Sequence, residues 1–375
     1  MAAVEKVLII GGGIGGLSTA ISLRRADIEV DLVEINKAGN VCHVGIVMQG
    51  NAIRAMAALG IAERCVAAGF SCDGMTFEDL HGRVLADFRG VRLAGPALPS
   101  DLGLSGPALR DVLTETARAL GARIRLGVTF SEIVPTEAAV HVSFTDGASA
   151  AYDLVVGADG VNSQTRAAMF GAPPAPHFTG QGVWRYTVPR PSDIHRPFLV
   201  KGIPGGSAGF IPLSDDTGNV LLVQSEPGNP QFPADRLAEL FRARLATCTG
   251  VLAKLRGQII DSRQVIYRPL HSIFMPAPWY RGRVLLIGDA AHAMTPHLGQ
   301  GAAQAMEDAV VLGELLAGAA PLPDRLETFM ARRYERCKLV YEASIQVGEW
   351  EQHPTPDANP ACLRARIAGV YARPI

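Results

Sequence analysis

The chain has 375 residues, and its 35 Lys and Arg side chains almost balance its 36 Asp and Glu side chains. This near-neutral charge offers no basic stripe for nucleic acid or an anionic lipid surface, and no apolar run reaches the length of a membrane span. The six cysteines are scattered without a Cys-x-x-Cys pair, which argues against a disulfide framework and against a zinc site or other metal site. We therefore expect a cytoplasmic protein. We also expect two subdomains, because the chain is longer than one ordinary core requires.

Near the N-terminus, a short apolar strand runs into the glycine-rich segment 11–16, and a helical apolar pattern follows it. Gly11, Gly13 and Gly16 fit G-x-G-x-x-G, in which the glycines allow a tight turn, the approach of a pyrophosphate and close packing of helix on strand. Glu34 ends the next strand, where a carboxylate accepts hydrogen bonds from ribose hydroxyls. The alternative is a glycine-rich loop with a surface carboxylate, but the register of these features favours a dinucleotide site.

The middle of the chain begins with a hairpin-like pair of strands over residues 72–90. Farther on, residues 153–163 form an apolar strand, a Gly-Ala-Asp-Gly turn over 157–160, and the start of a helix. Asp159 in this turn is either a residue that caps the helix or part of a second segment of the same ligand site.

An antiparallel sheet is predicted between residues 181 and 267, because several short strands there are separated by Pro, Gly and Asp turns. One helix is expected within it, over 233–246. Side chains alternate along a strand, so Trp184 and Tyr186 share one face and Arg185 takes the other. Only one of these two faces can look into a ligand pocket.

The last third of the chain holds a third glycine turn, within residues 284–308. A short apolar strand ends there at an acid, Asp289, and a helix opens after the Gly-Gln-Gly segment 299–301. Small residues, free helix amides and an acid at a strand end suit a phosphorylated or polyol ligand. A long helix is predicted over 322–352, and we expect an irregular tail after His353.

The three glycine motifs together resemble those of the single-component FAD-dependent aromatic hydroxylases, whose type member is para-hydroxybenzoate hydroxylase. The chain is most similar to the branch with salicylate, 3-hydroxybenzoate and urate hydroxylases. The motifs are GGGIGG, VVGADGVNSQTR and LLIGDAAHAMTPHLGQG, and the resemblance covers residues 5 to about 345. It implies an α/β fold in which a Rossmann-like FAD-binding domain of the GR2 type is interleaved with an antiparallel β-sheet substrate domain and followed by a long C-terminal helix. The expected parts are an FAD-binding domain (1–71, 102–172 and 277–318), a substrate domain (72–101 and 173–276) and a C-terminal helical segment with a tail (319–375).

The resemblance also implies an activity. NAD(P)H would dock transiently near residues 157–160 and reduce the FAD, and the reduced flavin would trap dioxygen as a C4a-hydroperoxide that hydroxylates a small aromatic or heteroaromatic substrate. The protein would act as a monomer or a homodimer. The alternatives are a flavin-dependent epoxidase or reductase, a halogenase of the same fold, and a non-catalytic flavin-binding protein.

One departure from the family pattern concerns an arginine that usually contacts FAD before a helix in this region. Gly106 stands in its place here. Arg110, one turn farther on, either substitutes for that arginine or is an ordinary surface residue of the helix.

The motifs and the resemblance give a set of cofactor residues. They are Gly11, Gly13, Ile14, Gly15, Gly16, Glu34, Val47, Arg110, Phe130, Asp159, Asp289, Pro296, Leu298, Gly299, Gly301 and Ala302.

The substrate site is expected between the antiparallel sheet and the flavin, because ligand pockets lie at domain junctions. The expected lining residues are Trp184, Tyr186, Phe210, Pro212, Gln224 and Met294. Three further residues are candidates for chemistry: Arg185 as the partner of an acidic group, and His297 and His43 as bases that remove a phenolic proton. For each histidine, the alternative is an imidazole that only satisfies backbone groups.

Overall fold

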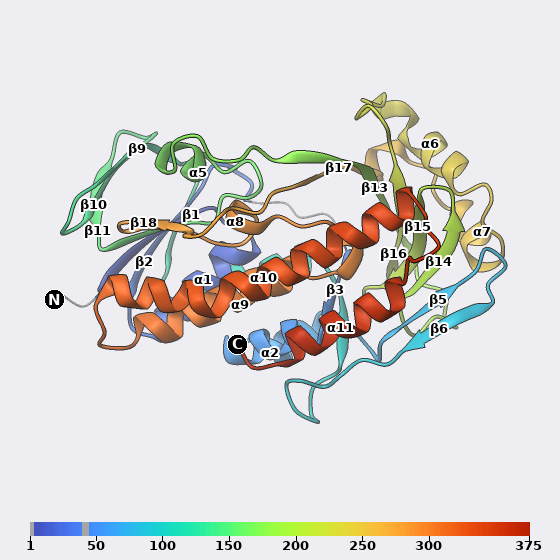
Figure 1. Cartoon of the computed structure of the whole chain (residues 1–375), viewed down its shortest axis with the longest axis horizontal. Coiled ribbons are helices and arrows are strands. Elements are labelled where there is room, and N and C mark those ends of the chain that lie inside the picture. Colours follow the sequence, from blue (N-terminus) through green and yellow to red (C-terminus); the bar gives the residue numbers. More distant parts are fainter. Residues whose placement is uncertain (1–3, 40–44) are drawn as a thin grey trace.

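The structure is a computed structural model, and it describes residues 4–39 and 45–375. Figure 1 shows an elongated α/β molecule with one sheet around β1 (Lys6–Ile10) and another around β15 (Gly206–Pro212). The long helix α10 (Leu322–Gln352) runs between the two sheet regions, and it confirms the predicted C-terminal helix. Within the described residues, no helix has both the length and the apolar character needed to cross a membrane.

The first sheet has six strands in the order β18-β19-β12-β1-β2-β8, and its inner strands pair in parallel. The remaining strands are β18 (Tyr280–Arg281), β19 (Val284–Leu286), β12 (Leu154–Gly157), β2 (Glu29–Glu34) and β8 (Arg123–Leu126). The three glycine motifs and Glu34 follow or end the four neighbouring strands β1, β12, β19 and β2. Because the carboxyl ends of parallel strands meet at one edge, this topology brings all of them together.

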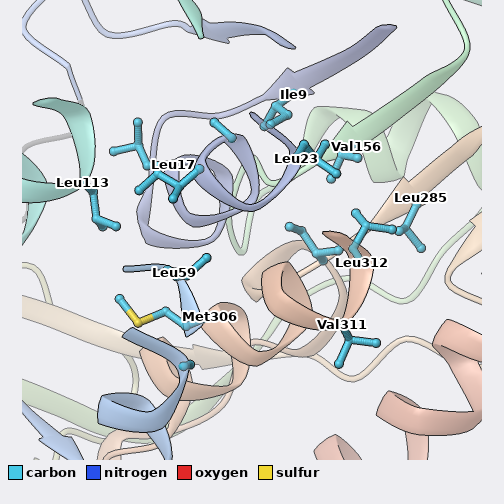
Figure 2. Close-up of a cluster of buried hydrophobic side chains, with 14 of the residues drawn as sticks. Ile9, Leu17, Leu23, Leu59, Leu113, Val156, Leu285, Met306, Val311 and Leu312 are labelled. Carbon is cyan, nitrogen blue, oxygen red and sulfur yellow. The ribbon is translucent and has the colours of Figure 1, made fainter. Parts of the chain in front are cut away.

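Helices cover this sheet and form its core. The helices of this part are α1 (Ile14–Arg25), α2 (Gly50–Ala58), α3 (Ala62–Ala67), α4 (Gly106–Ala119), α5 (Gln164–Met169), α8 (Asp289–His292), the short 3-10 helix η3 (Pro296–Leu298) and α9 (Gly301–Leu316). Figure 2 shows α1 and α9 side by side, with apolar side chains such as Leu17, Met306 and Leu312 between the elements. The two helices approach closely because Gly313 has no side chain: a Cβ there would lie 2.1 Å from Ser22 Oγ.

The second sheet has seven strands in the order β17-β13-β16-β15-β14-β5-β6. Its other strands are β17 (Ile266–Ser272), β13 (His177–Pro189), β16 (Thr217–Ser225), β14 (Phe198–Ile203), β5 (Met75–Glu78) and β6 (Val84–Phe88). The predicted pair of strands over 72–90 is confirmed as β5 and β6, and β5 joins the sheet by pairing in parallel with β14.

One face of the second sheet is covered by helices, and the other faces the carboxyl edge of the six-stranded sheet. The covering elements are η1 (Ala234–Arg236), α6 (Leu237–Arg244), α7 (Gly250–Arg256) and η2 (Ser262–Gln264). Their buried side chains and those of the sheet form a separate core around Trp184, Phe210 and Phe241. The sequence predicted one helix in this region, whereas α7 is a second one.

Two small sheets complete the fold. They are β3 (Gly45–Gln49), β7 (Asp101–Ser105) and β4 (Phe70–Cys72), and β11 (Ser149–Tyr152), β10 (Val140–Phe144) and β9 (Phe130–Pro135).

The expectation of an irregular tail after His353 is wrong, because the chain ends in helix α11 (Pro360–Ala372). The Asn359 side chain caps this helix by accepting a hydrogen bond from the Cys362 amide, and proline occupies its first turn. Leu363 and Ile367 are buried against α10 and η3. This long-range packing stabilises a helix whose Pro-rich approach favours an irregular chain.

Candidate functional site

A cavity of about 840 Å³ lies between the carboxyl edge of the six-stranded sheet and the uncovered face of the seven-stranded sheet. All three glycine motifs contribute to its wall, together with Glu34 and with residues of β13, β15 and β16. The cavity therefore joins the part of the molecule with dinucleotide-binding character to the antiparallel sheet.

The first glycine motif is built for close contact. Gly11 has φ +110°, and a Cβ there would lie 2.4 Å from the Ala158 carbonyl oxygen, so the first motif packs directly on the second. A Cβ at Gly16 would lie 1.9 Å from the Gly11 oxygen, which explains the third glycine. Helix α1 starts without a side-chain cap and without an acid in its first turn. Its leading amides face the cavity region and suit a pyrophosphate.

Glu34 is buried at the end of β2 and lines the cavity. Its carboxylate accepts hydrogen bonds from the amides of Gly12 (2.8 Å) and Asn36 (2.9 Å). These two bonds fix the carboxylate in place and leave it acceptor capacity for the ribose hydroxyls of a dinucleotide.

In the second motif, the carboxylate of Asp159 caps helix α5. It accepts hydrogen bonds from the Thr165 amide (2.9 Å), the Thr165 hydroxyl (3.0 Å) and the Ser163 hydroxyl. The Asp159 side chain thus binds the first turn of α5, whose N-cap residue is Ser163. The turn itself, from Ala158 to Gly160, still lines the cavity.

Arg166 joins the second and third motifs, a role that the sequence analysis did not assign. Its buried guanidinium donates to the carbonyls of Ala290 (2.9 Å) and Val161 (2.7 Å). Burial lowers the pKa of Arg166, and nearby Asp159 partly offsets this effect. An arginine in the VVGADGVNSQTR segment was the available signal, but its partner is far away in the sequence.

The third motif places Asp289 in the cavity wall at the start of α8. Solvent reaches the carboxyl group from the cavity, but the protein around it still raises its pKa through desolvation. A carboxylate at this strand edge suits the hydroxyls of a polyol ligand.

Asp308, on helix α9, supports the turn of the third motif from the protein interior. It accepts hydrogen bonds from the Gly288 amide (2.9 Å) and Arg333 Nε (2.7 Å), and it pairs with His292 Nε2 (2.7 Å). Burial opposes ionisation, yet His292 and Arg333 lower the pKa of Asp308 to about 2. His292, Asp308 and Cys337 have the composition of a metal site, but the buried Arg333 guanidinium already approaches Cys337 Sγ at 3.3 Å. The Arg333 guanidinium therefore already supplies this cluster with the positive charge that a metal ion would bring.

The segment after the third motif provides a surface for a planar ring system. Pro296, Leu298, Gly299, Gly301 and Ala302 line the cavity, and Gly299 has φ +66°. Helix α9 begins without a side-chain cap, so its first amides are free for a ligand. With α1, Glu34 and Asp289, this arrangement fits FAD.

The structure also places the other expected cofactor residues. Val47 and Arg110 line the cavity, and the Arg110 guanidinium bonds the adjacent Asp111 at 2.8 Å. Phe130 does not line it: its ring packs with a separate core beside β10, and its neighbour Thr129 is in the wall instead. His43 lies outside the described residues.

At the end of the cavity that the antiparallel sheet forms, the two faces of β13 have different surroundings. Arg185 lines the cavity, and its Nη1 donates to the Gly45 carbonyl. Trp184 is fully buried on the opposite face, where its indole donates to Glu226 (3.0 Å) and its ring lies 4.5 Å from that of Tyr267. The placement of Trp184, Tyr186 and Phe210 around the substrate is therefore wrong, because α6 and α7 cover the face that carries them.

Two further expected residues, Pro212 and Gln224, lie outside the cavity wall, whereas Met294 is in it. The sequence analysis missed the aliphatic side chains of the uncovered sheet face. They are Val183, Leu199, Ile211, Leu221, Val223, Ile266 and Leu270. No Phe, Tyr or Trp side chain lines the cavity among residues 4–39 and 45–375. Alternation along β13 and β16 was the signal, but the direction of each face depends on the helices that cover the sheet.

A charged cluster closes the cavity on the side of α10. Glu351 bonds Lys201 through one oxygen, and its other oxygen lies 3.4 Å from His297 Nε2. Arg364 donates to the His297 carbonyl at 2.7 Å. Burial opposes the charge on Glu351, but His297 and Lys201 lower its pKa to about 2. The two ring nitrogens of His297 are enclosed and make no regular hydrogen bond.

Comparison with known proteins agrees with this geometry. The profile of the family described as FAD binding domain matches residues 5–344, and the chain belongs to this family. A putative FAD-dependent monooxygenase of Bacillus subtilis, YetM, is 30% identical and covers 92% of this chain and 93% of its own. The 2-heptyl-3-hydroxy-4(1H)-quinolone synthase of Pseudomonas aeruginosa is 33% identical, with coverages of 93% and 90%.

Among solved structures, the Klebsiella pneumoniae protein HpxO in complex with FAD and uric acid superimposes with a TM-score of 0.87. It is 25% identical and covers 98% of this chain and 96% of its own. The resemblance to the single-component FAD-dependent aromatic hydroxylases is thus confirmed. The protein is an FAD-dependent monooxygenase with FAD as its cofactor.

Proposed function

We propose that this monooxygenase consumes NAD(P)H and dioxygen to hydroxylate a small aromatic or heteroaromatic ring that carries an acidic or enolic oxygen. The single observation behind this proposal is the placement of Arg185 on an aliphatic sheet face that looks into the same cavity as the three glycine motifs. We also place the reaction in the cytoplasm, where NAD(P)H is available and where the described cysteines, all free thiols, stay reduced.

Bound FAD supplies the redox chemistry and the activation of dioxygen. The protein's own residues hold and orient it. The α1 amides would bind the pyrophosphate, Glu34 the ribose, Asp289 the polyol hydroxyls, and the start of α9 the flavin ring. Apolar walls exclude water from the site, which protects reactive species formed there from side reactions.

The substrate ring would lie against the sheet face around Val183 and Leu221, with its oxygen substituent toward Arg185. A guanidinium suits a planar anion through two parallel hydrogen bonds. The relatives support a heteroaromatic substrate, since one is named for a quinolone and a neighbour was solved with uric acid. Aliphatic walls favour a ring over a highly charged substrate.

His297 is the candidate base for a phenolic or enolic proton. The carboxylate of Glu351 lies beside Nε2, and a carboxylate in that place stabilises the imidazolium that proton abstraction creates. His43 is the second candidate. Because both His297 nitrogens are enclosed, proton transfer from a ring in the cavity would require a water or a small movement of the imidazole.

The test is turnover by the purified holoprotein. We expect NADH or NADPH oxidation to accelerate when the right hydroxybenzoate, hydroxypyridine or quinolone is added, with one atom of ¹⁸O from labelled dioxygen in the product. Halide-dependent product formation would instead identify a halogenase. Oxygenation of an isolated alkene would identify an epoxidase. A flavin that dithionite reduces but neither pyridine nucleotide reduces would identify a non-catalytic flavin protein.

A further inference from the structure

A second cavity of about 140 Å³ lies beside the first, between helix α11 and the segment 88–93 (Figure 1 shows α11 beside α2). We call it the annex. Its wall is formed by Val47, Gln49, Gly50, Gly74, Met75, Phe77, Phe88, Arg89, Gly90, Val91, Leu93, Asp101, Leu298, Arg364, Ala365, Ala368, Tyr371 and Ala372.

The annex and the main cavity share part of their wall. Val47, Gln49, Met75, Leu298 and Arg364 line both. A ligand that reaches from one cavity into the other therefore has to pass only this layer of side chains. Met75 is the most adaptable of them, because an unbranched thioether with three rotatable bonds repacks easily.

The charged and amide side chains of the annex are already paired within the protein. Arg364 donates to the His297 carbonyl (2.7 Å), and Gln49 donates to the Leu298 carbonyl (3.0 Å). Asp101 accepts from the Gly74 amide at 3.0 Å. Burial raises the pKa of Tyr371 to about 12, so its hydroxyl stays neutral. A polar ligand group would have to break these contacts, whereas a hydrocarbon would not.

Most of the remaining annex wall is apolar, and it has two parts. Phe77 and Phe88 pack edge to face on one side, with ring centroids 5.3 Å apart. On the other side, α11 presents the small side chains of Ala365, Ala368 and Ala372. Space at this position exists because these residues are alanines.

Helix α11 is held firmly enough to serve as a wall. Arg54 donates to the carbonyls of Tyr371, Ala372 and Arg373, and Arg336 donates to those of Val370 and Tyr371. These bonds satisfy carbonyls that a helix end otherwise leaves without partners. The annex is therefore bounded by a helix that is hydrogen-bonded to the rest of the fold.

We propose that the annex binds an unbranched aliphatic substituent of the aromatic substrate while the ring stays in the main cavity near Arg185. This inference rests on the proposed hydroxylase function and adds the substrate class: an aromatic or heteroaromatic ring with a linear alkyl chain. The annex gives such a chain largely apolar walls, charged and amide side chains that are already paired, and a position next to the ring site.

The experiment is a binding series on the FAD-loaded protein. The probes are 4-hydroxyquinoline and its 2-methyl, 2-propyl, 2-pentyl and 2-heptyl derivatives, and the signal is the change in flavin absorbance. Burial of one methylene contributes about 0.8 kcal/mol, which corresponds to about a fourfold gain in affinity. We expect the dissociation constant to fall about fourfold per methylene until the annex is full. NADH oxidation is measured in parallel as the readout of the proposed function.

The matched variants are on helix α11. Ala368→Phe fills the annex, and we expect it to remove most of the chain-length dependence. Ala361→Phe is the control, because Ala361 is exposed on the same helix outside both cavities; it should retain the full dependence. Melting temperature and FAD content show that each variant is folded.

Three results would overturn the inference: affinity that changes less than twofold from methyl to heptyl, a chain-length dependence that survives Ala368→Phe, or no binding of any member of the series. The proposed function has a separate outcome. It stands if any aromatic compound, with or without an alkyl chain, stimulates NADH oxidation, and it fails if none does while the alkyl series still binds.

Discussion

Arg166 donates a hydrogen bond of 2.9 Å to the Ala290 carbonyl, and this contact ties the second glycine motif to the third. The two motifs are far apart in the sequence but lie on the neighbouring strands β12 and β19. Through Val161 and Ala290, one buried guanidinium thus fixes the relative position of the two turns that line the cavity.

Arg166→Met is expected to lower the free energy of unfolding by roughly 2–4 kcal/mol, because it leaves one buried and one partly buried carbonyl without their charged donor. FAD occupancy should fall as well, since the turn that carries Asp289 loses its anchor. Urea unfolding and the absorbance ratio of flavin to protein measure the two effects. Arg92→Met is the control, because Arg92 makes a similar bond to the Pro96 carbonyl on the surface. Equal effects of the two substitutions would contradict the anchoring role.

The motif residues could be predicted from sequence because their roles are local. Gly11 needs a positive φ and Gly16 a missing side chain, and both needs are visible in the pattern of strand, glycines and helix. The sheet face that lines the cavity could not be predicted in the same way. Alternation placed Trp184 and Arg185 on opposite faces, but only α6 and α7, which cover one face, decide which of them reaches the cavity.

The C-terminal helix was missed for a related reason. The proline content of the tail indicates an irregular chain, while Leu363 and Ile367 become buried only against η3 and α10. Packing between distant parts of the chain outweighs local preference there. The annex wall is therefore invisible in the sequence.

Glu34→Ala is expected to weaken FAD binding by about 1–3 kcal/mol, because the ribose hydroxyls lose a charged acceptor. The measurement is the dissociation constant of FAD for the apoprotein, from flavin fluorescence. Glu132→Ala, at an exposed position on β9, serves as the control. Unchanged affinity in Glu34→Ala would show that the carboxylate only binds the amides of Gly12 and Asn36.

Asp289→Ala is expected to yield mostly apoprotein. The carboxylate is the side chain placed to accept from polyol hydroxyls at the third motif, and a ligand hydroxyl without an acceptor costs about 1–3 kcal/mol. Asp289→Asn keeps one acceptor oxygen and should retain more flavin than the alanine variant. Flavin content after purification decides the matter, and full occupancy in Asp289→Ala would refute the assignment.

Acid stability should depend on Glu351, which faces His297, Lys201 and Arg364. Folding lowers the pKa of Glu351 from 4.5 to about 2. Its contribution to stability is therefore present above about pH 4.5 and is lost as the pH falls toward 2. Near pH 7, Glu351→Gln should destabilise the protein by roughly 2–4 kcal/mol, because Lys201 loses its buried partner.

The difference between wild type and Glu351→Gln should then shrink as urea unfolding is repeated from pH 6 down to pH 3. Glu342→Gln, an exposed position on the same helix, is the control and should change stability by less than about 0.5 kcal/mol. A gap between wild type and Glu351→Gln that stays constant over this range would contradict the lowered pKa.

Arg185 is the residue on which substrate selection is expected to depend. Arg185→Ala should lower kcat/KM for the best substrate with an acidic group by roughly 10- to 100-fold, the loss of a charged, two-pronged hydrogen bond. Arg185→Lys should recover only part of it, since an ammonium group cannot form the planar pair. Neutral phenols should be affected little by either substitution.

Arg263→Ala is the control for loss of positive charge, because the Arg263 side chain is far more exposed than that of Arg185. Because Arg185 also donates to the Gly45 carbonyl, FAD content and melting temperature are measured for each variant. An intact kcat/KM for the acidic substrate in a folded, FAD-loaded Arg185→Ala variant would exclude the arginine as its partner.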